Sequence, residues 1–552
     1  MKPSTESRAK SITGRLPYFA FITLLVTGAF AVLAPQNFMM DDSFFYFQIA
    51  NNIAHSLGST FNGIHETNGY HPLWMICCSA FAFLSGGDKQ LLLQIGAFAQ
   101  LLLTGGILFY GIKIARSIAL ESYYYFMPIL IAFFLTFALI GSEGVINGFF
   151  FAQTIFLLLK YRDSERASHW FLIGLSMGLM FLSRLDNGIV VVVLLTMARL
   201  YNLKEIGFKS SLKLFASASL GVALLAVPYL AYNYINFGHL VPISGALKST
   251  FPAISPKIFS ISKTGAMYAS FSVALILWGI AFERDKVRRQ LALLIGAGSL
   301  STNLYVFAFT DNVTNWNWYW ALNAIALVFL LAFIFQYFFK SERARALRIA
   351  AGLAAFTCFS AYAGLFSYTQ FINPVTLGYI PTLSEDAGGK RWQVAMGEWI
   401  NKNLPQGTVI ATADWPGMLA YYSNAKIFAI DGLVANFKVQ DSIKSLGMRY
   451  YLKSIGARYL FGPNTNVSKP FMGFATEKEP GGSMKFQFYS VLHRIGTDII
   501  IIPMEERLVE TDEIQPRSTV GSDKYFDSWS LWKLDGASLQ YFPITQTTGA
   551  GR

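Results

Sequence analysis

Residues 321–339 read ALNAIALVFLLAFIFQYFF, and residues 340–348 directly after them read KSERARALR. The first stretch is apolar and uncharged, and it is long enough to cross the hydrocarbon core of a bilayer as a helix. The second stretch is rich in basic residues, which typically stay on the cytoplasmic side of a membrane. Together they predict a membrane-spanning helix whose carboxyl end lies in the cytoplasm.

Apolar runs of this kind recur from residue 17 to residue 366. Hydrophobic residues make up 53% of the 552 residues and charged residues only 14%, which is unlike a soluble enzyme. We predict a polytopic α-helical membrane domain over residues 1–366, with about eleven transmembrane helices. The first run follows a basic segment, and we expect it to be a retained helix and not a cleaved signal peptide. The expected helices lie at 17–35, 90–111, 124–140, 147–159, 170–182, 188–201, 214–232, 264–281, 290–309, 321–339 and 349–366.

The distribution of positive charge predicts how the helices are oriented. The net charge of +12 comes from short clusters between apolar runs, so it indicates membrane topology and argues against nucleic-acid binding. Every other loop is strongly basic and is assigned to the cytoplasm. The apolar segment 71–86 is expected at the outer membrane interface, because a full span there would invert all later loops. This topology places residues 367–552 on the extracytoplasmic side.

Residues 367–552 mix charges, glycines and short apolar stretches, as a water-facing domain does. Alternating strands and helices predict a small α/β domain without a glycine-rich phosphate fingerprint. We expect it to bind an acceptor or to cover the membrane domain, with Asp414, Trp415 and Asp431 as contacts, although these positions also fit ordinary turns. The expected strands are 408–412, 427–430, 458–461 and 497–502, with a helix near 440–455.

The weakly basic loops on the predicted outer face carry most of the unusual polar residues. After the pair Asp41 and Asp42, the residues Gln48, Asn52 and His55 share one helical face, which predicts an amphipathic helix along the membrane surface. Each feature alone has an ordinary explanation. An acidic pair complements a helix dipole, and aromatic residues near 316–320 form an interfacial belt. Because charges near a bilayer are costly, their occurrence on one face predicts a polar outward-facing cavity.

The stretch DDSFFYFQIANNIAHSLGSTFNGIHETNGYHPLW, from Asp41 to Trp74, resembles the first extracytoplasmic loop of GT-C-fold glycosyltransferases. These are multi-spanning enzymes that use polyprenyl-phosphate sugars, and the mycobacterial arabinofuranosyltransferases among them have a comparable paired Asp and turn. Three further elements follow in the family's order. They are Gly141-Ser142-Glu143, with Ser in place of the family's Met, the Arg-x-Asp element at Arg184 to Asp186, and Pro242-Ile243-Ser244-Gly245-x-x-Lys248.

The resemblance implies inverting transfer of a sugar from a polyprenyl-phosphate donor to a glycan, lipid or protein acceptor of the cell envelope. It also implies the periplasmic face of a bacterial inner membrane. Asp41 is expected as the general base, with Asp42 positioning it or exchanging roles with it. Arg184 and Lys248 are expected to bind the leaving phosphate. The expected substrate-binding residues are Glu143, Arg184, Asp186, Lys248, His71, Glu66, Asn68 and Trp318.

A divalent cation, Mg²⁺ or Mn²⁺, is a further expectation, with Asp42 and Glu143 as ligands, although the sequence holds no complete ligand set. Two other functions remain open at this point: a transporter or flippase of lipid-linked sugars, and a non-catalytic protein of envelope assembly. Few charges lie within the apolar runs and no inverted repeat is evident, which argues against a transporter.

Overall fold

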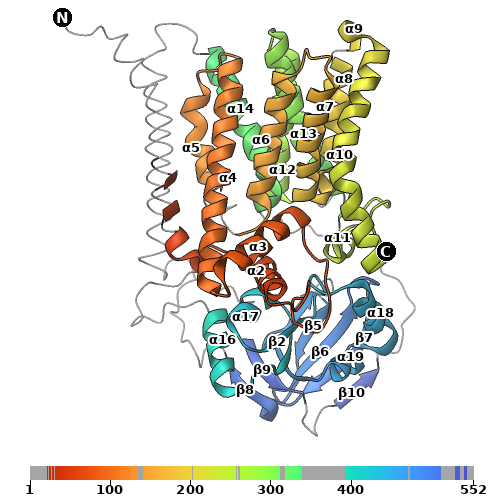
Figure 1. The fold of residues 1–552 in the computed structure, drawn as a ribbon. Helices are drawn as coiled ribbons and strands as arrows, with labels where there is room; N and C mark the ends of the chain where they lie inside the picture. The colour runs from red at the N-terminus through yellow and green to blue at the C-terminus, as the bar shows by residue number, and fades with distance from the viewer. Residues whose placement is uncertain are drawn as a thin grey trace, which may run out of the picture.

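The computed structural model describes residues 31–134, 141–201, 203–256, 262–310, 317–338, 392–469, 473–510, 529–534 and 540–543, with a few isolated positions between 22 and 29 and at 258. Within these residues the chain forms a bundle of helices standing on a mixed α/β domain (Figure 1). Between the two lie α2 (Asp41–Ala54), α3 (Pro72–Ser85) and the short α11 (Ile243–Lys248).

Five described helices are long and apolar enough to cross a membrane, which makes this a multi-pass membrane protein. They are α4 (Lys89–Ser117), α10 (Phe208–Phe237), α12 (Lys263–Ala281), α13 (Lys286–Phe309) and the segment Trp318–Phe338, which includes η4 (Asn317–Trp320) and α14 (Ala321–Phe338). The bundle also contains α5 (Tyr123–Phe133), α6 (Gly144–Lys160), α7 (Ala167–Ser183), η3 (Leu185–Asn187), α8 (Gly188–Tyr201) and α9 (Leu203–Ile206).

These positions confirm the helices expected between residues 90 and 339, as far as the structure describes them. The expected helix at 349–366, most of that at 17–35, and the boundary between residues 366 and 367 lie outside the described residues. The number of spans therefore stays a prediction. The loops predicted to be cytoplasmic, such as the one between α6 and α7, lie at the end of the bundle that faces away from the α/β domain (Figure 1).

Local sequence explains where the helices begin and how closely they pack. Asp88 caps α4, because its carboxylate accepts a hydrogen bond from the N–H of Leu91 at 3.0 Å. The helices α7 and α10 touch at two glycines. A Cβ on Gly174 would lie 2.0 Å from the carbonyl oxygen of Ala218, so only glycine permits this approach. Gly221 makes the reciprocal contact from α10.

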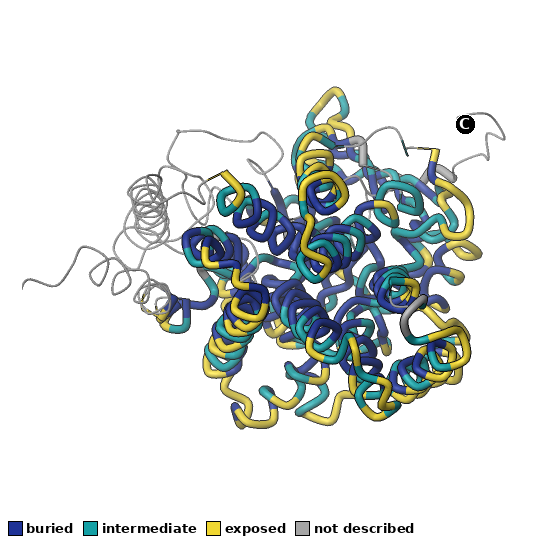
Figure 2. The backbone as a smooth tube through the Cα atoms, turned by 90° about the horizontal axis from the view of Figure 1, so that it is seen from above, coloured by how far each residue is buried: buried dark blue, intermediate teal, exposed yellow. Residues whose placement is uncertain are grey.

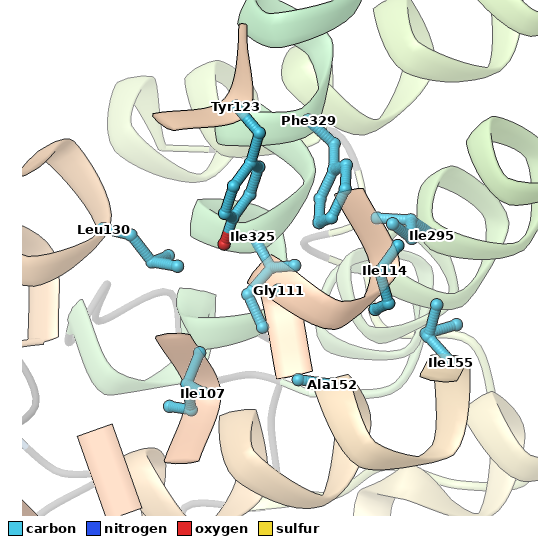
Figure 3. A pocket seen from close by; sticks show the side chains of 10 residues that line it. All are labelled: Ile107, Gly111, Ile114, Tyr123, Leu130, Ala152, Ile155, Ile295, Ile325 and Phe329. Carbon is cyan, nitrogen blue, oxygen red and sulfur yellow. The ribbon is translucent and has the colours of Figure 1, made fainter. Parts of the chain in front are cut away.

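Burial follows the pattern of a bundle in a bilayer. Seen from above, buried residues line the inner sides of the helices and exposed residues the outer sides (Figure 2). On α10 the exposed residues include Leu220, Leu224 and Val227, an apolar surface suited to lipid. Inside the bundle, helices α4, α5, α6, α13 and α14 surround a small apolar cavity of about 10 Å³ (Figure 3). The hydroxyl of Tyr123 reaches Gly111 in this pocket.

The helix α2 differs from the sequence prediction. It is not an amphipathic helix on the membrane surface, because Phe44 and Phe47 are fully buried and the ring of Phe44 packs against Tyr421 of the α/β domain. Its polar face serves the first loop, where the side chain of Asn52 donates to the carbonyl oxygen of Thr60 at 2.8 Å. The α/β domain, which lies far along the chain, covers the side of α2 that was expected to face water.

The C-terminal region is an α/β domain, as predicted, with two five-stranded sheets. The first sheet has the order β2-β1-β3-β9-β8, in which β1, β2 and β3 are parallel, and the second, β10-β7-β6-β5-β4, is antiparallel. The strands are β1 (Val409–Thr412), β2 (Lys426–Ala429), β3 (Ala457–Pro463), β4 (Val467–Lys469), β5 (Phe474–Lys478), β6 (Met484–Ser490), β7 (Ile495–Ile502), β8 (Arg507–Glu510), β9 (Trp529–Lys533) and β10 (Gln540–Pro543).

Four helices of this domain bear on the argument. They are α16 (Trp392–Asn403), α17 (Pro416–Tyr422), α18 (Phe437–Leu446) and α19 (Met448–Ser454). The single helix expected near 440–455 is two helices, since Gly447 interrupts it with a φ of +82° that glycine adopts readily. The parallel strands β1 and β2 end side by side at the edge of the sheet that faces α2 and α11 (Figure 1).

Candidate functional site

The polar loops come together where the bundle meets the α/β domain. The first loop contributes Asp42 and His71, the start of α6 contributes Glu143, the turn after α7 contributes Arg184 and Asp186, and α11 contributes Lys248. These residues are far apart in sequence, and all were predicted to lie on one face of the membrane. The structure brings them to one end of the bundle.

Arg184 is the centre of a buried ion network. Its Nη1 donates to Glu143 Oε1 at 2.7 Å, while its Nη2 and Nε donate to the two oxygens of Asp186 at 2.8 and 3.1 Å. The side chain of Arg184 is only 3% exposed. The guanidinium also lies over the ring of Tyr319, with Cζ 4.3 Å from the ring centre. Arg184 is therefore held in one orientation by three partners, Glu143, Asp186 and Tyr319.

Tyr46 and His71 complete the surroundings of Glu143. The hydroxyl of Tyr46 donates to Glu143 Oε2 at 3.0 Å and accepts from the backbone N–H of His71 at 3.2 Å. The N–H of Leu185 donates to His71 Nδ1 at 3.3 Å, which leaves the proton on Nε2, the atom 3.7 Å from Glu143 Oε1. Burial alone would raise the pKa of Glu143, but His71 and Arg184 outweigh it and lower that pKa.

Asp42 and Lys248 lie beside this network but outside it. Both side chains are partly buried, and among the described residues neither makes a hydrogen bond or an ion pair within 4 Å. Burial raises the pKa of Asp42, although the positive charge of Lys248 opposes the rise. Lys248 stays protonated, because Tyr319, Asp42 and Glu143 raise its pKa against the effect of burial. These two groups are the ones available to a ligand.

Asp41 is used differently from its neighbour. Its two carboxylate oxygens accept hydrogen bonds from the backbone N–H groups of Gly417 and Met418, both at 2.8 Å. These N–H groups are at the start of α17, so Asp41 joins the membrane domain to the α/β domain. Burial raises the pKa of Asp41 to about 8, and the two hydrogen bonds only partly counteract it. The side chain is buried, and both of its oxygens are taken up by this contact between the domains.

The α/β domain presents two acidic residues to the site. Asp414 follows β1 and Asp431 follows β2, and the carboxyl ends of adjacent parallel strands lie at one edge of a sheet. Burial raises the pKa of Asp431 to about 7, with Asp414 and Asp42 adding to the rise. Trp415, next to Asp414, has a φ of +56°, a strained backbone conformation that is uncommon outside functional or tightly packed segments.

Three other predicted site residues have other surroundings. Asn68 is buried and supports α11, since its Oδ1 accepts from the N–H of Ile243 at 3.1 Å and its Nδ2 donates to Asn233 at 3.2 Å. The side chain of Glu66 is exposed, outside the ion network. Trp318 is buried against Gly144, where a Cβ would lie 2.9 Å from that of Trp318. Asn68 and Trp318 therefore lie behind the residues that face the site.

Two residues of the network were absent from the predicted set. Tyr46 is four residues after Asp42 in α2, and this helical spacing predicts a shared face. Tyr319 is adjacent to the predicted Trp318, and it is the ring that contacts Arg184. We interpreted residues 316–320 as an interfacial aromatic belt, and therefore did not predict the contact between Tyr319 and Arg184. Composition alone cannot separate the two, because both use aromatic residues.

Of the two residues expected to hold a divalent cation, Asp42 is open to one and Glu143 is not. Among the described residues no group of three or more His, Cys, Asp or Glu side chains has a metal-binding arrangement. Both oxygens of Glu143 are already hydrogen-bonded, to Arg184 and Tyr46. Mg²⁺ held by Asp42 alone would need water and substrate phosphates as its remaining ligands. A cation stays a prediction, and the chemistry proposed here uses none.

Comparison with known proteins gives one match in sequence and several in structure. Residues 383–506 match the family model described as a domain of unknown function, DUF8728, which covers part of the α/β domain. A comparison with curated proteins gives no match.

The oligosaccharyltransferase of Archaeoglobus fulgidus, solved with an acceptor peptide tethered to it, is similar in structure, with a TM-score of 0.47 at 13% identity over 88% of this chain and 76% of that one. The arabinofuranosyltransferase AftD from Mycobacteria has a TM-score of 0.39 at 12% identity over 83% of this chain. The R1389S mutant of AftD has a TM-score of 0.42 at 14% identity. This chain spans 37% of the length of AftD.

Proposed function

We propose that this chain is a membrane glycosyltransferase that transfers a sugar from a polyprenyl-phosphate donor to an acceptor of the cell envelope. The observation that supports this most directly is that Asp42 and Lys248 lie near each other, each without a hydrogen bond or ion pair to a described residue. A carboxylate and an ammonium group, neither occupied by another described residue, lie beside a rigidly held arginine at the end of a membrane bundle. The motif resemblance of the four loops points to the same chemistry.

Asp42 is the proposed general base. Transfer to a hydroxyl requires a group that removes its proton as the new bond forms. Asp41 was expected first for this role, but its two oxygens are bound to backbone N–H groups of α17. Asp42 is the neighbour without such partners, and burial raises its pKa, which strengthens it as a base. The two residues of the pair therefore exchange the roles expected from the motif.

Lys248 is the proposed contact for the leaving phosphate. A departing phosphate gains negative charge, and a fixed cation stabilises it in the transition state. Arg184 lies further back, since Glu143 and Asp186 occupy much of its donor capacity, so it fixes the positive potential of the site and orients its walls. One base and one stabilised leaving group are sufficient for a direct displacement, which inverts the anomeric centre.

The topology and the acceptor are also part of the proposal. The site lies at the end of the bundle opposite the basic loops, and the positive-inside rule then places it on the periplasmic side of a bacterial inner membrane. The α/β domain closes this side of the site with Asp414 and Asp431. We infer that the acceptor, a glycan, a lipid or a protein, enters between this domain and the bundle.

The decisive experiment compares envelope glycans by mass spectrometry in the source organism without its own copy of the gene. The strain is complemented with the wild type, Asp42→Asn, or Asp163→Asn as a control on the far end of the bundle, where the carboxylate is 71% exposed. The proposal requires that the wild type and the control restore a sugar that Asp42→Asn does not. If Asp42→Asn restores the same glycans at equal expression, the chain is a transporter or an assembly protein and not a transferase.

A further inference from the structure

Arg199 is a buried cation at the end of the bundle that faces away from the α/β domain, and none of the described residues supplies it with an anion. It lies in the last turn of α8 and is only 4% exposed. None of its three guanidinium nitrogens, Nε, Nη1 and Nη2, has a hydrogen-bond partner in the described part of the chain. Its contact is the ring of Trp170 in α7, whose centre is 3.4 Å from the guanidinium carbon.

A buried guanidinium without hydrogen-bond acceptors destabilises the folded protein. It carries five N–H donors, and burying a charge without a partner is far more costly than burying one with its counterion. The same chain shows the complete arrangement at Arg184, where Glu143 and Asp186 accept three hydrogen bonds. An unsatisfied buried group of this kind is consistent with an ion or molecule that the described residues do not supply.

Trp170 gives Arg199 a fixed platform. The indole N–H of Trp170 donates to the carbonyl oxygen of Ser164 at 3.0 Å, and the residue is fully buried. Stacking on an indole covers one face of a guanidinium but leaves its edge, which carries the N–H groups, for an acceptor. A planar fork held in this way suits a phosphate or a carboxylate.

The surface around Arg199 indicates which acceptor. Leu200, directly after it, is 62% exposed, and Phe208 and Leu212 on the adjoining first turns of α10 are 71% and 56% exposed. Lys209 and Lys213 are exposed on the same turns. Exposed apolar side chains next to cations are typical of the bilayer surface, where acyl chains and phosphates meet.

We propose that Arg199 and Trp170 form a binding site for the phosphate group of an anionic phospholipid. The acyl chains lie against Leu200, Phe208 and Leu212, and Lys209 and Lys213 add to the attraction. The nitrogens of Arg199 are enclosed, so binding requires the side chains that cover the edge of the guanidinium to move aside, while its face stays on Trp170. This site is independent of the proposed transferase activity and lies at the other end of the bundle.

The test measures thermal unfolding of the full-length chain in a neutral detergent with three additions: phosphatidylglycerol, phosphatidylcholine and inorganic phosphate. Phosphatidylglycerol is expected to raise the melting temperature of the wild type by several degrees more than phosphatidylcholine does. In Arg199→Met this difference should disappear, with affinity for phosphatidylglycerol reduced roughly tenfold or more, because a charged hydrogen-bond donor is lost. Lys113→Met, which removes an exposed cation of α4 that is not part of this site, is the control and should keep the difference.

Three outcomes overturn the proposal. Equal stabilisation of the wild type by phosphatidylglycerol and phosphatidylcholine excludes a site for anionic lipid, and so does an unchanged response in Arg199→Met. A shift with inorganic phosphate alone that equals the lipid shift shows a site for a free anion. If Arg199→Met fails to fold, Arg199→Lys replaces it, because lysine keeps the charge but loses the fork and should weaken the response. Counting lipid adducts by native mass spectrometry gives an independent measure.

Discussion

Asp41 and Gly417 are 376 positions apart in the chain, yet the N–H of Gly417 donates to Asp41 Oδ2 at 2.8 Å. The N–H of Met418 donates to the other carboxylate oxygen, so both oxygens of Asp41 accept hydrogen bonds from the α/β domain. Asp42, the adjacent residue of α2, lies near Lys248 and Glu143. One acidic pair thus performs two tasks, because the first residue fixes the domains and the second faces the site.

This division predicts different consequences for the two isosteric substitutions. Asp42→Asn removes the proposed base and should lower the transfer rate by roughly 100- to 10,000-fold, the usual contribution of general base catalysis, with little effect on stability. Asp41→Asn should lower stability by about 1–3 kcal/mol, because the amide nitrogen of Asn cannot accept the second N–H hydrogen bond. Transfer assays together with thermal unfolding separate the two effects. Equal loss of rate with unchanged stability in both variants would contradict the division.

Gly417 allows a second test of the domain contact. A Cβ at this position would lie 2.2 Å from the carbonyl oxygen of Asp41, so Gly417→Ala must push α17 away from α2. We expect a loss of about 1–3 kcal/mol, typical of overpacking, and faster proteolysis between the bundle and the α/β domain. Gly188→Ala is the matched control, since its Cβ would meet its nearest neighbour at an ordinary 3.6 Å. If both variants behave alike, the contact at Asp41 is not tight.

The bundle helices were predictable because the length of an apolar run is a local property of the sequence. The cations and carboxylates of the site were predictable for a similar reason, since each lies in a short loop at the end of a run. The alternating basic loops separated the two ends of the bundle correctly. The sequence also predicted the strands β1, β2, β3 and β7, which are apolar and stand next to turn residues.

The remaining features depend on contacts between distant segments. The sequence of α2 does not show that Tyr421 covers Phe44, so we expected one face of this helix to be exposed to water. The role of Asp41 depends on two N–H groups of α17, which any residue type would offer. The strands β4, β5, β6, β8, β9 and β10 were not predicted, because several are short and mix polar with apolar residues. From the sequence, Arg199 is only a residue near the end of the expected helix 188–201.

Arg184 is predicted to be a source of stability as well as of positive charge. Lysine at this position keeps the charge but cannot reach both Glu143 and Asp186, which leaves a buried carboxylate without a partner. We expect Arg184→Lys to cost about 3 kcal/mol or more, as is typical of breaking a buried pair, and to abolish transfer. Arg162→Lys is the control, since its partner Asp163 is 71% exposed and such pairs contribute about 1 kcal/mol or less. Similar melting temperatures for both variants would show that the network is not stabilising.

Tyr123 offers a stabilising substitution inside the bundle. Its hydroxyl is buried in the apolar pocket of Figure 3 without a hydrogen-bond partner among the described residues. An unsatisfied buried hydroxyl carries a desolvation cost, so Tyr123→Phe should raise stability by about 1 kcal/mol. Tyr421→Phe should have the opposite effect, because the hydroxyl of Tyr421 donates to the carbonyl oxygen of Lys89 at 2.6 Å. Destabilisation by Tyr123→Phe would show that the hydroxyl has a partner, such as a bound water.

Asp431 predicts how stability depends on pH. Burial raises the pKa of this carboxyl from 3.8 to about 7, so the folded chain holds a proton that the unfolded chain releases. Its contribution to stability is therefore complete below pH 4 and is lost as the pH rises through about 7. Asp431→Asn keeps an acceptor for the N–H of Leu433 but does not titrate. The variant should melt close to the wild type at pH 4 and at a higher temperature at pH 8, where the wild type has to bury an ionised carboxylate. A difference of the same size at both pH values would contradict this assignment, because it would mean that the folded chain does not hold the proton on Asp431.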